Sequence, residues 1–320
     1  MTTRGDTRIL LATDFSTPAQ RAYAYAARLA SALEARVVIL NVLEGPPGLD
    51  REFPVNTLYL ERLQNESKLE LGRLVRVAEE AGLRPEPMQE YGVPAVRISE
   101  VAGKTGAILV VLGTHGRTGW DRLLLGSTAE RVVREAPCPV LTVRVTKAEE
   151  RMESPGGVRV DRLLVPMDFS EFAQEAFEYA ALLAKRLGAG IRLVHAMEPA
   201  AYPLDFSLMH VSDEKTLKAR VRERLLELVA VLKADGVAAE SVVEMGAPGE
   251  VILTQAGGEA GRAADAIVMG THGRGGLKRL ALGSVAEYVV RHAACPVFTV
   301  KSPKYQSRPG GEAGDAGQKT

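Results

Sequence analysis

Short apolar runs alternate with amphipathic stretches along the chain. Residues 8–13 form an apolar run that ends at Asp14 and Ser16, and aspartate and serine both favour the start of a helix. The alanine-rich segment 19–35 follows, and the β-branched run 36–43 after it predicts a strand buried on both faces. The apolar positions at helical spacing in 19–35 are Tyr23, Ala26, Ala27, Ala30 and Leu33.

The same alternation continues to residue 300. In the first half it predicts helices over 60–82, 94–106 and 127–136, and strands over 85–92, 107–113 and 138–145. In the second half it predicts strands over 162–167, 191–197, 241–246, 266–270 and 295–300, with helices over 171–188, 223–236, 250–261 and 284–293. Parallel neighbours need crossover connections, so this order indicates an α/β fold with a five-stranded parallel sheet in each half, covered by helices on both faces.

The chain is an internal repeat. Gly113 and Gly270 are 157 positions apart, as are the two cysteines, Cys138 and Cys295. At that offset, 22 of the 31 residues in 113–143 are identical to their counterparts. Upstream, the phrases ATDFS and PMDFS align at an offset of 154. We therefore expect two copies of one domain.

The predicted domains are residues 1–147 and 158–303. Residues 148–157 are rich in charge, Ser, Pro and Gly and are expected to form a linker. The polar, glycine-rich stretch 304–320 is expected to be a disordered tail.

Composition narrows the class of protein. The chain has 320 residues, and its 40 basic residues balance its 40 acidic residues, which argues against a general nucleic-acid binder. No apolar run has the length of a membrane span, so we expect no membrane contact and a cytoplasmic location. The two cysteines begin equivalent strands and fit buried thiols, and no cluster with metal-ligand spacing is present.

Each half contains a glycine phrase, GTHGRTGWDRLLLGST at 113–128 and GTHGRGGLKRLALGSV at 270–285. Each phrase follows a predicted strand and ends at a predicted helix. Glycines permit close approach to the backbone, and the first amides of a helix favour an anion. Two such amide-rich segments can converge on a polyphosphate, and the hydroxyls of Ser127 and Ser284 can add a donor or a ligand for Mg²⁺. A tight turn with no ligand is the simpler alternative. The spacing is neither a P-loop nor GxGxxG.

With these motifs the chain resembles the universal stress protein family, as two such domains in tandem. The resemblance covers residues 5–302 and rests on Gly-x2-Gly-x9-Gly-Ser together with ATDFS, PMDFS, CPVLTV and CPVFTV. It implies Rossmann-like domains of the adenine-nucleotide α-hydrolase type, with strand order 3-2-1-4-5 and an ATP pocket in each half. The residues it places at the first pocket are Thr13, Asp14, Val42, Leu112, Gly113, Gly116, Arg117, Gly126, Ser127 and Thr128. Those at the second are Met167, Asp168, Ala196, Met269, Gly270, Gly273, Arg274, Gly283, Ser284 and Val285.

Two positions depart from the family pattern. Ala196 is smaller than the usual valine, which would loosen the packing of adenine in the second pocket. Ile108 stands where the second half has Asp265, the commoner form, and its place at the start of a strand keeps it away from ligand.

Binding is favoured over catalysis. His115 and His272 lie inside the loops, but the sequence offers no evident Walker lysine, base or second acid for phosphoryl transfer. We expect an ATP-binding stress regulator with slow or no hydrolysis, with or without Mg²⁺. A weak ATPase or nucleotidyl-transferring enzyme, and an interaction module with vestigial pockets, remain alternatives. The apolar closing strands of the two halves are expected to pair within the chain as a pseudo-dimer, and a further homodimer is left open.

Overall fold

The computed structural model describes residues 7–44, 54–114, 125–145, 158–198, 211–258, 263–273 and 282–301. The first-half strands are β1 (Arg8–Ala12), β2 (Arg36–Leu43), β3 (Pro85–Tyr91), β4 (Leu109–Gly113) and β5 (Val140–Val143), and the helices are α1 (Thr17–Leu33), α2 (Pro54–Glu80), α3 (Pro94–Thr105) and α4 (Ser127–Glu135). The second-half strands are β6 (Arg162–Pro166), β7 (Gly190–Met197), β8 (Ala239–Met245), β9 (Ala266–Gly270) and β10 (Val297–Val300), and the helices are α5 (Glu171–Leu187), α6 (Val211–Ala234), α7 (Pro248–Gly257) and α8 (Ser284–His292).

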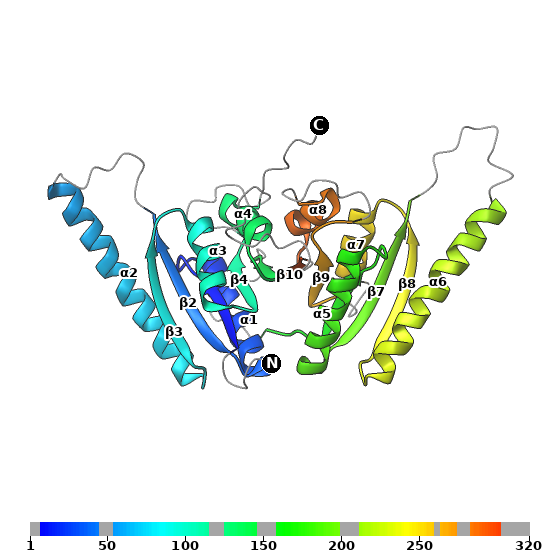
Figure 1. Ribbon diagram of the computed structural model, residues 1–320, viewed down its shortest axis with the longest axis horizontal. Coiled ribbons are helices and arrows are strands. Elements are labelled where there is room, and N and C mark those ends of the chain that lie inside the picture. Colours follow the sequence, from blue (N-terminus) through cyan, green and yellow to red (C-terminus); the bar gives the residue numbers. More distant parts are fainter. Residues whose placement is uncertain are drawn as a thin grey trace, which may run out of the picture.

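The strands form one ten-stranded sheet in the order β3-β2-β1-β4-β5-β10-β9-β6-β7-β8 (Figure 1). All neighbours within a half are parallel, as the alternation of strands and helices predicted. The winding direction reverses between β1 and β4 in the first half and between β6 and β9 in the second, and open α/β sheets bind ligands at such strand ends.

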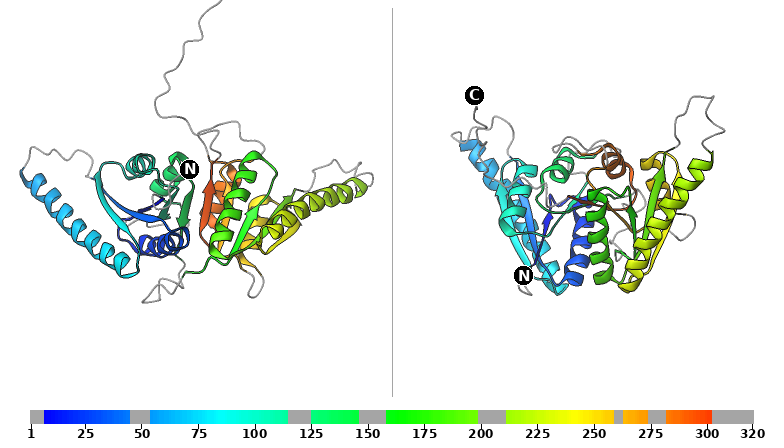
Figure 2. Two further views of the ribbon diagram at one scale, coloured as in Figure 1. Left: turned by 60° about the horizontal axis from the view of Figure 1, so that its bottom comes forward. Right: turned by 45° about the vertical axis from the view of Figure 1, so that its right-hand side comes forward.

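Each face of the sheet carries one layer of helices. Buried residues of α1, α2, α5 and α6 pack in one apolar cluster, and those of α3, α4, α7 and α8 pack in the other. Figures 1 and 2 show α1 and α5 near the centre of the molecule and α2 and α6 at its two outer ends. The sheet is therefore buried on both faces, which explains the unbroken apolar runs of its strands.

The buried face of α1 differs from the sequence expectation. Ala26 and Ala30 are in the core as predicted, but Tyr23 and Leu33 lie at its edge, Ala27 is only partly buried, and Tyr25 is buried instead. The alanine-rich sequence fits the helical template in two neighbouring registers. The packing of α1 against β4 and the second half selects one of them.

The two halves join through β5 and β10, which pair antiparallel. The hydroxyl of Thr142 donates to the carbonyl of Val297 at 3.2 Å, and the hydroxyl of Thr299 donates to the carbonyl of Val140 at 3.2 Å. These residues are equivalent in the repeat, so the contact follows a pseudo-twofold axis. Each closing strand covers the edge that the other would otherwise expose.

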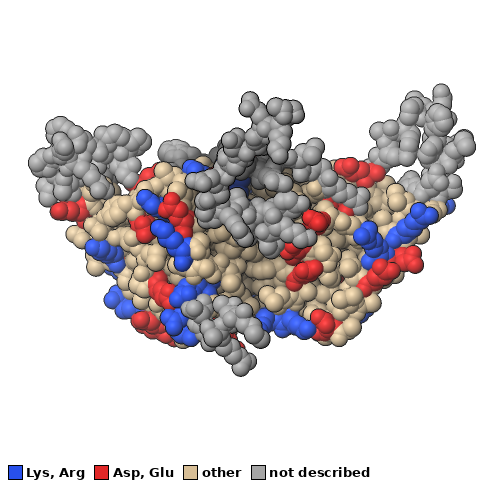
Figure 3. Space-filling view, viewed as in Figure 1, with Lys and Arg blue, Asp and Glu red and all other residues tan. Residues whose placement is uncertain are grey.

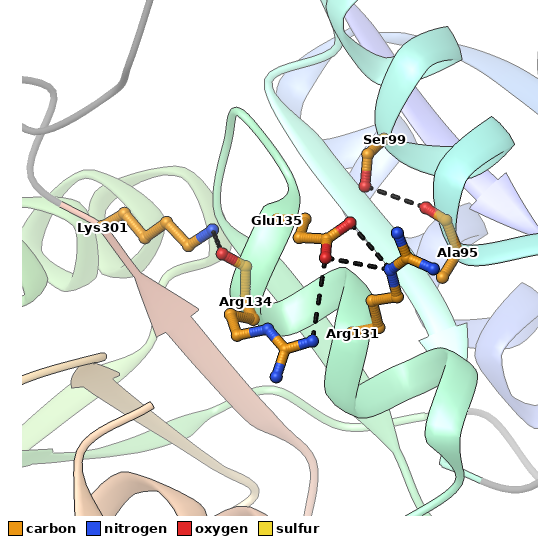
Figure 4. Close-up of polar contacts among 6 residues, drawn as sticks. All are labelled: Ala95, Ser99, Arg131, Arg134, Glu135 and Lys301. Atoms are coloured by element: carbon orange, nitrogen blue, oxygen red, sulfur yellow. Dashed lines mark hydrogen bonds and ion pairs between the residues drawn. The ribbon is translucent and has the colours of Figure 1, made fainter. Parts of the chain in front are cut away.

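Reciprocal side-chain contacts extend this junction. Lys301 donates to the carbonyl of Arg134 (Figure 4) and to the carbonyl of Ala136, both at the end of α4, and Arg144 donates to the carbonyl of Arg291 at the end of α8. Arg144 and Lys301 are equivalent positions, as are Arg134 and Arg291. A cation at a helix C-terminus compensates the unpaired carbonyls there, and each half provides it for the other.

Several expectations concern residues outside the described ranges. The predicted linker at 148–157 and tail at 304–320 lie there, and the predicted domain boundaries remain predictions. Within the described ranges, no helix combines the length and hydropathy needed to cross a bilayer, and no group of three or more His, Cys, Asp or Glu side chains forms a metal-ligand cluster.

Both cysteines are free thiols. Burial raises the pKa of Cys138 and of Cys295 to about 12, so neither is an activated thiolate at neutral pH.

Candidate functional site

A cavity of about 870 Å³ lies at the carboxyl ends of the second-half strands. Its walls come from the ends of β6, β7 and β9 and from the first turns of α7 and α8, with α6 closing one side. The cavity lies beside the reversal between β6 and β9, where open α/β sheets bind their ligands. Its volume is within the usual range of small-molecule sites.

The structure brings together nearly all of the residues predicted for the second-half pocket. Those that line the cavity are Met167, Asp168, Ala196, Met269, Gly270, Gly273, Gly283, Ser284 and Val285. Arg274 lies outside the described residues.

The first half places its described site residues at equivalent positions. Gly116 and Arg117 lie outside the described residues. The described ones occupy the end of β1 (Thr13, Asp14), β2 (Val42), the end of β4 (Leu112, Gly113) and the start of α4 (Gly126, Ser127, Thr128). The amides of Thr13 and Met167 donate to the carbonyls of Leu40 and Val194 at 2.9 and 2.8 Å, so both halves end their first strand in the same way.

The two aspartates organise the turn that follows the first strand. Oδ1 of Asp168 accepts hydrogen bonds from the amide and the hydroxyl of Ser170, at 2.9 and 2.6 Å. The Ser170 hydroxyl also accepts from the amide of Ala173, which caps α5. Oδ1 of Asp14 accepts from Ser16 in the same way, at 3.1 and 2.5 Å. The helix-starting role predicted for Asp14 and Ser16 is thus shared by one aspartate–serine pair in each half.

The glycines of the second phrase are explained largely by protein contacts. A Cβ on Gly270 would lie 2.7 Å from the carbonyl oxygen of Phe172, in the first turn of α5. A Cβ on Gly273 would lie 2.7 Å from Oδ2 of Asp168. In the first half, a Cβ on Gly113 would lie 2.8 Å from Cβ of Pro18. Close approach to the backbone was predicted from the spacing, but at these three positions the approaching group is the protein itself.

Among the described residues, a backbone hydrogen bond closes the base of each loop. The amide of Gly283 donates to the carbonyl of Thr271 at 2.9 Å, and the amide of Gly126 donates to the carbonyl of Thr114 at 2.8 Å. The loop therefore leaves the strand and returns at one point, which fixes the start of α8 and of α4 beside the strand end.

The start of α8 presents amides to the cavity. The first intrahelical hydrogen bond is donated by Glu287 to the carbonyl of Gly283 at 2.9 Å. The amides of Ser284, Val285 and Ala286 precede it, and these three residues line the cavity. Helix-start amides lack intrahelical partners and attract negative charge, so this wall of the cavity suits an anion.

The halves differ in the side chain that contacts the carbonyl at the end of the first strand. In the first half, the side-chain amide of Asn41 donates to the carbonyl of Thr13 at 2.9 Å and accepts from Ser67. In the second half, Nδ1 of His195 lies 2.5 Å from the carbonyl of Met167, and the ring packs against Phe169. Since a carbonyl only accepts, Nδ1 of His195 carries a proton. The carbonyls of Thr13 and Met167 are equivalent, and different side chains satisfy them in the two halves.

Comparison with known proteins identifies the fold and the family. The model of the universal stress protein family matches residues 7–144 and 159–301. The chain belongs to the universal stress protein family. A universal stress protein of Mycobacterium tuberculosis is 26% identical over 298 residues, covering 92% of this chain and 96% of the relative. A universal stress protein of Methanocaldococcus jannaschii is 39% identical over 144 residues, covering 44% of this chain and 84% of the relative.

Among solved structures, a universal stress protein from Archaeoglobus fulgidus has a TM-score of 0.65 and 23% sequence identity. The alignment covers 92% of this chain and 96% of that one. At this identity the likeness establishes the fold, a tandem of two universal stress protein domains, and leaves the ligand to be argued from the site.

Five further charged or aromatic residues of this universal stress protein line the cavity and were missed from the sequence, and His195 is one of them. Glu198 lies just beyond β7. Phe169 follows Asp168 in the turn, and its own φ is 61°. Arg220 and Arg224 come from α6. Glu198 directly follows the predicted strand 191–197, and its position at a strand end was a usable signal. No sequence signal marked the two arginines as cavity residues, since charged side chains on a helix usually face solvent.

Proposed function

We propose that this universal stress protein binds an adenine nucleotide, ATP foremost, in one pocket per half and acts as a stress-response regulator with slow or no hydrolysis. The observation that carries the proposal is the second-half cavity, where the first amides of α8, the residues of the glycine phrase and Asp168 meet at the strand ends.

The cavity offers complementary ends for a nucleotide. The amides of α8 suit the phosphates, while Met167, Ala196 and Met269 supply an apolar surface for a base. A Mg²⁺ ion carried by the phosphates would shield their charge. Oxygen ligands for it are present in Glu198 and in the exposed hydroxyl of Ser284.

Charged groups around the cavity favour binding over turnover. The titratable side chains that line it are Asp168, Glu198, His195, His272, Arg220 and Arg224, with no lysine among its described residues. Asp168 is held by Ser170, and Nδ1 of His195 faces the carbonyl of Met167. Incubation of the pure protein with Mg-ATP should yield little ADP or AMP. Sustained turnover at ~1 s⁻¹ would instead support the alternative that the protein is an ATPase or nucleotidyl-transferring enzyme.

A charge placed at the helix start tests the phosphate site. Ser127 and Ser284 are exposed first residues of α4 and α8, and a carboxylate there favours the helix while repelling phosphate. We expect Ser284→Asp to abolish ATP binding in the second half, as measured by calorimetry, and Ser127→Asp to do the same in the first.

The matched control is asparagine. Ser284→Asn has nearly the size of the aspartate variant without its charge, so ATP affinity should fall much less. Equal ATP binding by the aspartate variants and the unmodified chain would contradict the assignment of the phosphate end. Protein purified without nucleotide and without affinity for ATP would favour an interaction module with vestigial pockets.

A further inference from the structure

Two arginines on α6 line the second-half cavity. Arg220 and Arg224 are one helical turn apart, and neither forms an ion pair with a residue of the described part of the chain. The guanidinium of Arg224 lies over the ring of Phe169, 4.4 Å from its centroid. Phe169 itself lines the cavity and packs against His195, at 5.3 Å between ring centroids. The aromatic contact therefore positions one of the two cations at the cavity wall.

The first half carries carboxylates at these two positions. Gly82 and Gly236 end α2 and α6 in the same left-handed conformation, with φ of 75° and 78°, and they fix the alignment of the two helices. At that offset Glu66 corresponds to Arg220 and Glu70 to Arg224. Both glutamates have partners on their own helix. Glu66 forms an ion pair with Arg62 at 2.9 Å, and Glu70 forms one with Arg73 at 2.6 Å.

The difference extends along the helix. Residues 215–224 contain five cations and one carboxylate, whereas the equivalent residues 61–70 contain two cations and three carboxylates. Figure 3 shows Lys and Arg side chains at the upper right, over the first turns of α6. The equivalent segments of α6 and α2 thus carry opposite net charge.

The arginines approach the cavity from the face opposite the phosphate site. α6 belongs to the helix layer that packs with α1, α2 and α5, and α8 belongs to the layer on the other face of the sheet. A nucleotide whose 5′-phosphates are held by α8 and which crosses the strand ends brings its nucleoside part, with the ribose, towards α6. A phosphate on that ribose would meet Arg220 and Arg224 in the second half, whereas the equivalent positions of the first half hold carboxylates.

We propose that Arg220 and Arg224 form a second anion subsite, so that the second-half pocket prefers a nucleotide with an additional phosphate on its ribose. The first-half pocket has no such preference. This inference rests on the proposed function, because it assumes that the 5′-phosphates lie at α8.

The test compares two probes in a chain with one working pocket. In the Ser127→Asp chain only the second pocket binds, and adenosine 3′,5′-bisphosphate should bind about tenfold more tightly than AMP, a difference of about 1.4 kcal/mol. Arg220→Gln with Arg224→Gln should reduce that ratio to about one. Arg222→Gln is the matched control, since Arg222 lies on the same helix but does not line the cavity, and it should leave the ratio unchanged.

The converse exchange completes the test. In the Ser284→Asp chain the bisphosphate should show no advantage over AMP, and Glu66→Arg with Glu70→Arg should create one. Equal affinity of AMP and the bisphosphate for the second pocket, unaltered by the arginine substitutions, would overturn this inference and leave the proposed function standing. Failure of AMP, ATP and the bisphosphate alike to bind the Ser127→Asp chain would overturn both.

Discussion

The first and second halves turn the chain identically after their first strand, yet they differ in the side chains around that turn. Phe15 and Phe169 both take a positive φ, 63° and 61°, and a serine caps the next helix in each half. Beside this turn, an asparagine of the first half is replaced by His195, and Glu70 by Arg224. The hydrogen bonds of the turn require particular groups, whereas the walls of the crevice leave room for change. A shared backbone plan is therefore compatible with two pockets of different selectivity.

A similar difference occurs at the opposite end of the strands. Asp265 Oδ2 accepts hydrogen bonds from the amides of Asp161 and Arg162, both at 2.9 Å. The first half has Ile108 there, and its side chain is 37% exposed. The expectation that this position lies away from the ligand cavity agrees with the cavity lining, which does not include Asp265.

Glycine substitutions should give the largest effect in either half. Gly270→Ala places a Cβ against the first turn of α5, and Gly113→Ala places one against the first turn of α1, so we expect the free energy of unfolding of each to fall by about 3 kcal/mol. Urea denaturation of both variants measures it. The control is Gly72→Ala in α2, where a Cβ meets nothing within 4 Å and the helix should gain up to about 1 kcal/mol. Similar stability of all three variants would show that the strand–helix contact is loose.

Substitutions at the equivalent positions Asp265 and Ile108 should give the next largest effect on stability. Asp265→Ala removes an acceptor from two backbone amides, so we expect a loss of about 2 kcal/mol in unfolding free energy. Ile108→Asp should gain part of that amount, because the first half provides the equivalent backbone. Thermal unfolding of both variants checks this. If Ile108→Asp does not raise the unfolding free energy, the starts of the two strands differ more than their backbones indicate.

Lys301 should make stability depend on pH. Burial lowers the pKa of Lys301 from 10.5 to about 8. Between pH 8 and 10.5 the unfolded chain binds the proton that the folded chain has released, so the unfolding free energy contributed by this lysine rises with pH. We expect a rise of about 1 kcal/mol, relative to Lys301→Met, once partial exposure is allowed for.

The equivalent residue of the other half gives the control for this pH effect. Arg144→Met removes the reciprocal helix-end contact but no group with a pKa near 8, so its stability should parallel the unmodified chain over this pH range. A difference between Lys301→Met and the unmodified chain that stays constant from pH 8 to 10.5 would contradict the assigned burial effect.

The smallest expected effect is on ATP affinity, at the part of the second pocket proposed to hold the adenine base. Ala196→Val restores the residue of the first half, and the added apolar contact should raise ATP affinity of the Ser127→Asp chain about threefold. Calorimetry measures it, with Val42→Ala in the Ser284→Asp chain as the opposite change. A lower affinity for Ala196→Val would show that the valine obstructs the base.

Much of the fold could be predicted from the sequence, because each strand is a short apolar run and each helix has its own periodicity. The strand 36–43 has the same bounds in the structure, whereas α2 begins at Pro54 rather than at residue 60. The six extra residues carry little apolar periodicity, so the pattern alone gave no reason to include them. The alanine-rich face of α1 was ambiguous for the same reason.

The site was predictable only in part. The glycine spacing and Asp168 located the cavity, because strand ends and helix starts are readable along the chain. The contact of Gly270 with α5, and the arrival of Arg220 and Arg224 from α6, depend on packing between segments distant in sequence. The binding of ATP itself stays a prediction.

Native mass spectrometry of the intact chain with ATP tests the central claim most directly. The account predicts two bound nucleotides for the unmodified chain, one for Ser127→Asp, one for Ser284→Asp and none for the double variant. The same stoichiometry in all four proteins, or no bound nucleotide in the unmodified chain at saturating ATP, would contradict it.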